Sequence, residues 1–173
     1  MKLIILSYIF FLITGLTAIG QEIPCKKPCQ NFEKFLGTWQ WTSSRDTFTF
    51  KLIKDTFYFK PRDTVFILLT GWHKFISNGI ILESRMEFSD SVKNKFTTLV
   101  GFGTENNILS LGFIDITRDR SFDVKMELIN EKGNKATWTS FFTERIRINE
   151  PPPKIREGQT VPSNIVLLKI NDK

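Results

Sequence analysis

The chain has 173 residues, a formal net charge of +6 and an aromatic content of 13%, with 17 phenylalanines. That length suits a single domain with a substantial hydrophobic core. Basic and acidic residues alternate, as in TRDRSFDVK (117–125), so the surface lacks the basic stripe that nucleic-acid binding requires.

The N-terminus has the three parts of a secretory signal peptide. Lys2 precedes an apolar run (residues 3–13), and Ala18 and Gly20 supply the small residues of a cleavage site. We therefore expect residues 1–20 to be removed and the mature chain to be exported, to the periplasm or the extracellular space, without a membrane span. A transmembrane anchor is the alternative, but polar residues interrupt the run and no basic cluster follows it immediately.

Two cysteines, Cys25 and Cys29, lie in the short motif CKKPC. In an exported protein they favour a disulfide, which would close a very small loop and fix the N-terminal segment locally. A lipid anchor on Cys25 is disfavoured because the preceding residues EIP lack the expected small side chains. A metal site would need more ligands, and His73 is the only histidine, so we expect neither a metal nor a cofactor.

A short helical turn is expected over Asn31–Leu36. Asn31 can cap the turn, and Gly37 can end it in a left-handed conformation. Its apolar residues share one face and would plug one end of the following fold: Phe32, Phe35 and Leu36.

Beyond this turn the sequence alternates apolar and polar residues with a period of two. In DTFTFKL, for example, Phe48, Phe50 and Leu52 fall on one face. This pattern is typical of antiparallel strands covered on one side only. It predicts an all-β fold, an up-and-down meander that closes into a barrel or a strongly bent sandwich. The expected strands are 38–44, 46–53, 55–60, 64–76, 80–89, 95–103, 108–117, 121–130 and 134–148.

Asn78-Gly79 between two apolar arms predicts a type I′ hairpin turn, since both positions of that turn need positive φ. The resulting register pairs Phe75 with Leu82, Lys74 with Glu83, and His73 with Ser84. One face would carry the ion pair. The other would be mainly apolar, with Met86 further along it and His73 and Ser84 as a polar pair.

The composition changes near residue 150. The proline-rich segment 150–162 cannot join a strand ladder because proline lacks the N–H donor. The aliphatic run Ile165–Leu168 then predicts a strand over Ser163–Ile170, docked at an open edge. The mature chain is therefore divided into a barrel domain (21–149), a crossover (150–162) and a C-terminal strand segment (163–173).

The motif F-L-G-T-W (35–39) resembles the G-x-W signature that opens the first strand of lipocalins and fatty-acid-binding proteins. The resemblance implies a lipocalin-like barrel in which Gly37 turns the chain and Trp39 closes the floor. Trp41, two residues on, would share the inward face. Lipocalins also pack an arginine from a late strand over this tryptophan. The candidates here, which strand alternation would turn outward, are Arg145 and Arg147.

A second resemblance spans most of the mature chain. The motif F-x-G-T-W-x-W (35–41), GWHKFISNGIILES (71–84) and VPSNIVLLK (161–169) are similar to a family of uncharacterised secreted proteins from flavobacteria and related Bacteroidetes. That family is known only as a domain of unknown function. The resemblance implies export and a small β-rich domain, and it implies no activity.

The sequence favours a protein that is not an enzyme. Nucleophilic catalysis needs a base beside a nucleophile, but His73 is the only histidine and no G-x-S-x-G motif occurs. Glu83 and Glu87 could imitate a glycosidase pair. Both fall on the face that carries Lys74 and Arg85, which indicates a solvated ion-pair face.

Two functions are favoured over a third, a hydrolase built on His73, because about eight strands enclose either a packed core or one small ligand. The first is a non-enzymatic binder of a small apolar or amphipathic molecule at the barrel mouth. The ligand contacts expected for it are His73, Ser84, Phe75, Met86 and Trp138. The alternative is a packed interaction or scaffold module of the cell envelope without an internal ligand. It would bind a protein or glycan through exposed aromatic residues such as Trp72 and Tyr58.

Overall fold

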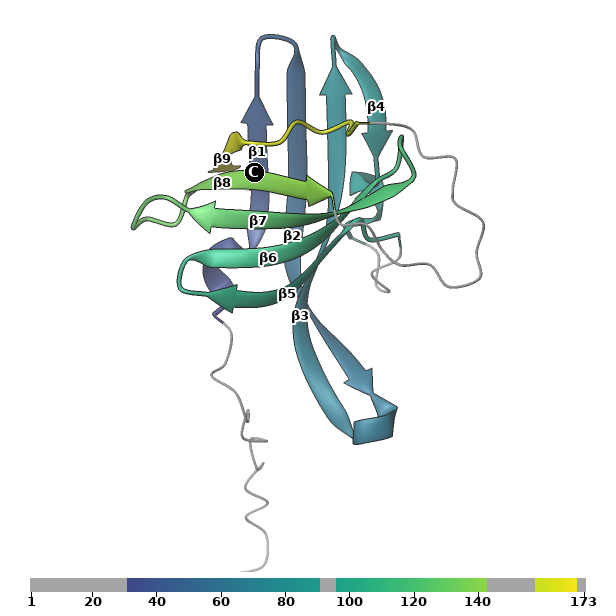
Figure 1. The fold of residues 1–173 in the computed structure, drawn as a ribbon, viewed down its shortest axis with the longest axis vertical. Helices are drawn as coiled ribbons and strands as arrows, with labels where there is room; N and C mark the ends of the chain where they lie inside the picture. The colour runs from purple at the N-terminus through teal and green to yellow at the C-terminus, as the bar shows by residue number, and fades with distance from the viewer. Residues whose placement is uncertain (1–30, 91–95, 143–157, 171–173) are drawn as a thin grey trace, which may run out of the picture.

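Eight antiparallel strands close into a barrel in the computed structural model, which describes residues 31–90, 96–142 and 158–170 (Figure 1). The strands are β1 (Gly37–Thr42), β2 (Asp46–Phe59), β3 (Thr64–Ser77), β4 (Ile80–Ser84), β5 (Leu99–Glu105), β6 (Ile108–Asp115), β7 (Arg120–Leu128), β8 (Lys135–Phe142) and β9 (Ile165–Ile170). The short 3-10 helices are η1 (Glu33–Phe35), η2 (Lys60–Arg62) and η3 (Met86–Phe88). β4 is an additional strand that pairs with β3 outside the ring. The predicted all-β antiparallel barrel is confirmed.

The barrel closes through its first and last strands. β9 pairs antiparallel with β1 on one side, Thr38 opposite Ile170, and with β8 on the other, Trp138 opposite Ile165. In Figure 1, β5 to β9 cross the upright strands β1 to β3. Residues from opposite ends of the described chain thus lie side by side, and the ring depends on the C-terminal strand.

Several element boundaries differ from those expected from the sequence. The two strands expected at 46–53 and 55–60 form one continuous strand, β2, because Lys54 and Asp55 are polar but do not break extended backbone. The strand expected at 80–89 ends at Ser84, and η3 follows. Asn31 does not cap η1, whose N-cap is Phe32 without a side-chain hydrogen bond.

The floor of the barrel is built from the F-L-G-T-W motif. Phe35 is buried, and the indole of Trp39 donates a hydrogen bond to the Phe35 carbonyl at 2.9 Å. Gly37 adopts a φ of +100° between them, a conformation that favours glycine. This geometry explains why the motif needs a glycine between the apolar turn and the tryptophan.

A cation from the last strand packs over the floor tryptophan. The Lys169 ammonium lies 5.5 Å from the centroid of the Trp39 ring and donates to the Lys34 carbonyl at 3.1 Å. Burial lowers the pKa of Lys169. The arginines considered for this position, Arg145 and Arg147, lie outside the described residues.

The interior is occupied by aromatic rings. Trp138 lies 5.2 Å from Phe48, 5.3 Å from Phe50 and 5.6 Å from Phe113, measured between ring centroids. All four side chains are fully buried, and His73 is 4.9 Å from the Phe113 ring. The inward-facing residues of β2, β6 and β8 therefore pack against one another across the barrel.

Replacing Gly37 with alanine should destabilise the fold by about 1–3 kcal/mol, because an L-residue is strained at this φ. The new Cβ would also lie 3.2 Å from Cε of Lys169. Gly79→Ala is the matched control, since φ is +78° there and, apart from its two chain neighbours, no described residue has an atom within 4 Å of the added carbon. Urea unfolding of both variants should show the larger loss for Gly37→Ala; equal losses would contradict the role of the Lys169 contact.

Candidate functional site

A β-bulge in the β3–β4 hairpin decides which side chains enter the barrel. The turn forms as predicted, with positive φ at Asn78 and Gly79. The register then shifts: Ile76 faces Ile81, but Phe75 faces Glu83 because Leu82 is an extra residue in β4. An insertion of one residue exchanges the two faces of a strand.

The bulge overturns three predicted orientations. Ser84 pairs with Lys74 and not with His73. Leu82, expected inside, is 48% exposed, whereas Glu83, expected in a solvated ion pair, is only 5% exposed. The partner that the structure places beside His73 is therefore a carboxylate and not a hydroxyl.

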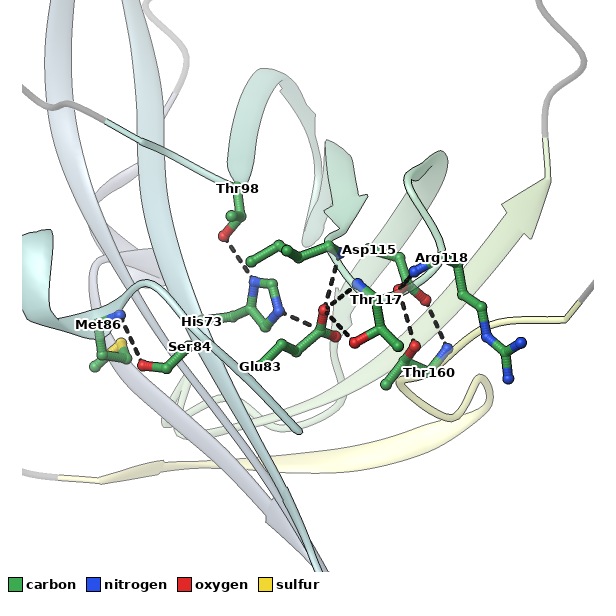
Figure 2. Close-up of polar contacts among 10 residues, drawn as sticks. His73, Glu83, Ser84, Met86, Thr98, Asp115, Thr117, Arg118 and Thr160 are labelled. Atoms are coloured by element: carbon green, nitrogen blue, oxygen red, sulfur yellow. Dashed lines mark hydrogen bonds and ion pairs between the residues drawn. The ribbon is translucent and has the colours of Figure 1, made fainter. Parts of the chain in front are cut away.

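His73 and Glu83 form a buried ion pair when the imidazole is protonated (Figure 2). Nε2 of His73 lies 3.3 Å from Oε1 of Glu83, and the side chains are 0% and 1% exposed. The contact lacks the alignment of a hydrogen bond, since neither atom has a hydrogen-bond partner among the described residues. On the other side of the ring, Nδ1 lies 2.7 Å from the Thr98 hydroxyl.

The second carboxylate oxygen of Glu83 binds the turn that follows β6. Oε2 accepts hydrogen bonds from the backbone N–H groups of Ile116 at 2.8 Å and Thr117 at 3.0 Å, and from the Thr117 hydroxyl at 3.3 Å. Burial acts to raise the pKa of Glu83, but His73 and the two amides outweigh it and hold the pKa below its ordinary value. The ionised carboxylate is therefore the form that this site stabilises.

Asp115, at the end of β6, holds the same turn to the C-terminal part of the chain. Its side chain is fully buried and accepts from the Arg118 N–H at 2.9 Å. It also accepts from the N–H and the hydroxyl of Thr160, at 2.6 Å and 2.8 Å. Figure 2 shows the two carboxylates on opposite sides of this turn. We call His73, Glu83, Thr98, Asp115 and Thr160 the buried carboxylate network.

Part of this network contains the groups of a catalytic triad, but the hydroxyl among them is buried. A hydroxyl, an imidazole and a carboxylate in a row are the groups of a nucleophile, a base and an orienting acid. Thr98, however, is 3% exposed and His73 is fully buried, so neither group is presented to solvent. The arrangement fits a role in holding β3, β4, the turn after β6 and the residue 160 region together.

The described residues contain no cluster of three or more His, Cys, Asp or Glu side chains placed to hold a metal ion. Within the same ranges of the chain, no helix is long and apolar enough to cross a membrane.

The structure separates the five predicted ligand contacts into two groups. His73, Phe75 and Trp138 are buried in the barrel. Ser84 and Met86 lie at the β4 edge, where the Ser84 hydroxyl donates to Glu87 at 2.8 Å and accepts from the Met86 N–H at 3.3 Å. Cys25 and Cys29 lie outside the described residues.

A second candidate site is the outer half of the β2–β3 hairpin, residues 53–68, which we call the finger. β2 and β3 stay paired to Phe59 and Thr64, but β1 reaches only Leu52 of β2. Figure 1 shows the finger extending beyond the barrel. Its exposed apolar side chains, each 45–54% exposed, are Phe57, Tyr58, Val65, Phe66 and Ile67.

The aromatic residues proposed from the sequence for docking are only partly accessible. Tyr58 is exposed on the finger and donates to Asp63 at 2.7 Å. Trp72 is 0% exposed, so its predicted exposure is wrong. The sequence did not identify the finger, because its alternation is that of any half-buried strand pair.

The sequence model of a family described as a family of unknown function (DUF6705) matches residues 1–170. No curated protein and no solved structure matches the chain. Since the family match covers nearly all of the sequence, the chain belongs to this family.

Replacing Glu83 with glutamine should destabilise the protein by about 3 kcal/mol at pH 7, because the change leaves the surrounding buried partners without the charge. The pKa of Glu83 is lower in the folded than in the unfolded chain. The ionised carboxylate therefore contributes fully to the free energy of unfolding at a pH above its pKa in the unfolded chain. This contribution is lost as the pH falls through its pKa in the folded chain.

Urea unfolding should be measured between pH 7 and pH 3 for the wild type and Glu83→Gln. The difference between their free energies of unfolding should become smaller as the pH falls. Glu87→Gln is the control, because this neighbouring carboxylate is exposed and also accepts from Ser84. A difference in the free energy of unfolding that stays constant over this pH range would contradict the lowered pKa of Glu83 in the folded protein.

Proposed function

We propose that this protein is a non-enzymatic interaction module, in which a packed barrel holds out the finger for docking to a protein partner. The observation that carries the proposal is the exposure of apolar side chains on both strands of the finger. Natural two-stranded ribbons rarely leave so much apolar surface in water unless another surface covers it.

The barrel interior is too well filled to favour an internal ligand, and this supports an external docking role instead. The positions that would line a ligand cavity are filled by Phe48, Phe50, Phe113 and Trp138, which contact one another. His73, the polar contact expected for a ligand, already faces Thr98 and Glu83. A small apolar ligand at the barrel mouth is the weaker alternative, since it would have to displace these groups.

The finger offers enough apolar surface for specific binding. Its five exposed side chains are about half accessible, so covering each contributes on the order of 1 kcal/mol. Together they supply on the order of 5 kcal/mol before the costs of association. Two phenylalanines and a tyrosine also give the composition typical of interface centres.

We also propose that the protein is exported and acts in a bacterial envelope. The support is the signal-like segment 1–20 and the resemblance to secreted proteins of flavobacteria. The partner would then be an envelope protein, and the Cys25–Cys29 disulfide would form in that oxidising environment.

A photo-crosslinking residue at position 57 of the finger should link the protein to a partner in its own cells. The same residue at Glu131, an exposed position in the β7–β8 turn, is the control. We expect discrete linked bands from position 57 that are absent from position 131, and denaturing gels would show them. The same bands from both positions, or none from position 57, would contradict docking through the finger.

The mass of the protein recovered from its own host should correspond to a chain that begins at Gln21. Intact mass spectrometry measures this directly, and the mass should fall further by about two hydrogens if Cys25 and Cys29 are bonded. A recovered chain that retains residues 1–20 would contradict export through this segment.

A further inference from the structure

One edge of the finger has no strand partner among the described residues. β2 covers one side of β3 to the end of the hairpin, without a break in register. On the other side, β5 pairs with β3 only from Leu69 to Gly71. Within the part of the chain that the structure describes, the segment Thr64–Leu68 therefore presents the backbone groups of an unpaired strand edge.

This edge lacks the features that protect free strands from pairing. Its sequence, TVFIL, has no charged residue and no proline, and the β3 register shift occurs far away, beside Phe75. The β2 edge of the finger, in contrast, carries Lys54 and Asp55, and the tip carries Pro61. Natural proteins guard exposed edges with charges, prolines or bulges, so an unguarded edge indicates an occupant.

We propose that a second copy of this chain pairs with the Thr64–Leu68 edge, antiparallel, about a two-fold axis at Phe66. This inference rests on the proposed docking role of the finger and names its occupant. The symmetry places Phe66 opposite the partner's Phe66, Val65 opposite the partner's Ile67, and Thr64 opposite the partner's Leu68. Every pair is apolar or contains threonine, so no charge is opposed by a like charge or buried alone.

The length of the free edge matches this arrangement. Pairing starts after the tip helix Lys60–Arg62 and ends where β5 takes over the edge at Leu69. Two fingers laid side by side would form one four-stranded sheet, with a barrel at each end. Isologous pairing of this kind closes on itself and adds no further copies.

The composition of the tip favours a second copy over a lipid surface. A finger entering a bilayer would carry Lys60, Arg62 and Asp63 into the hydrocarbon first, and charged groups there are costly. In the two-fold pair the same residues reach the base of the partner's finger, beside its Leu69, and do not enter hydrocarbon. The pairing is short and buries less than the about 1,200 Å² of a standard interface, so we expect micromolar association.

The decisive experiment is cysteine crosslinking of the purified mature chain. Residues on a two-fold axis meet their own copies, so Phe66→Cys should form a covalent dimer on mild oxidation. Mass spectrometry should then detect a disulfide that joins position 66 of one copy to position 66 of the other. Tyr58→Cys is the matched control, because it is equally exposed but lies on β2, away from the axis. Val65→Cys and Ile67→Cys should crosslink to each other in a mixture more readily than either does alone.

Sedimentation velocity gives a second measurement that does not depend on cysteine. The wild type should show a concentration-dependent dimer, and Phe66→Lys, which opposes two cations, should weaken it at least about tenfold. Circular dichroism would check that this variant keeps its fold. A monomer at all concentrations, or a dimer that Phe66→Lys leaves unchanged, would overturn the self-pairing. Position-57 crosslinks to a different protein would still support the docking function in that case.

Discussion

A carboxylate inside a protein must be compensated by groups that the fold holds in place, and Glu83 imposes this constraint on the barrel. Its two oxygens face an imidazole from β3 and two amides from the turn after β6. The adjacent Asp115 then fixes Thr160, which lies a few residues before the closing strand β9. One buried charge is thus connected, through a single turn, to the segment that completes the ring. Removing a partner would leave a desolvated charge, which costs far more than the lost contact alone.

The polar groups inside the barrel are paired mainly with one another, which leaves them little capacity to bind a ligand. The hydrogen-bonding capacity of the buried carboxylate network is directed mainly at other parts of the chain, and the surrounding space is filled by aromatic rings. Such an interior gives rigidity and a unique register, but its polar groups face one another and not a binding partner. Apolar side chains are also exposed on the barrel wall, such as Phe102 and Phe141, but those of the finger lie on a ribbon that extends beyond the ring (Figure 1). For this reason the proposed docking role is assigned to the finger and not to the barrel interior.

The sequence predicted the type of fold because two strong signals carry it. The alternation along DTFTFKL places Phe48 and Phe50 inside, and Asn78-Gly79 makes the turn that its positive φ requires. The sequence-based prediction failed at the candidate site because strict alternation of inward and outward residues cannot account for a bulge. One signal was available: Ile80, Ile81 and Leu82 are three consecutive apolar residues, and all three are exposed. A run that cannot alternate marks a place where the register can slip.

The contacts that join distant parts of the chain were beyond the reach of local patterns. Lys169 lies over Trp39 because β9 pairs with β1, and that pairing follows from ring closure and not from any motif in either strand. The finger has the same origin. Its residues alternate like those of a barrel strand, and they are exposed because β1 pairs with β2 only as far as Leu52 and β5 pairs with β3 only from Leu69.

An isolated two-stranded ribbon is marginal in water, yet the finger continues β2 and β3 without a break in their pairing. The strands are anchored in the ring at one end, so the loss of entropy on forming each further pair is reduced. This anchoring explains how the ribbon can stay extended without a partner. A ribbon already ordered by the barrel would lose less conformational entropy on docking than a flexible loop. More of the free energy gained by burying its apolar side chains would then contribute to the affinity. The proposed docking role thus depends on the barrel as well as on the finger, because the rigid ring would hold the short strand edge in the conformation that pairing requires.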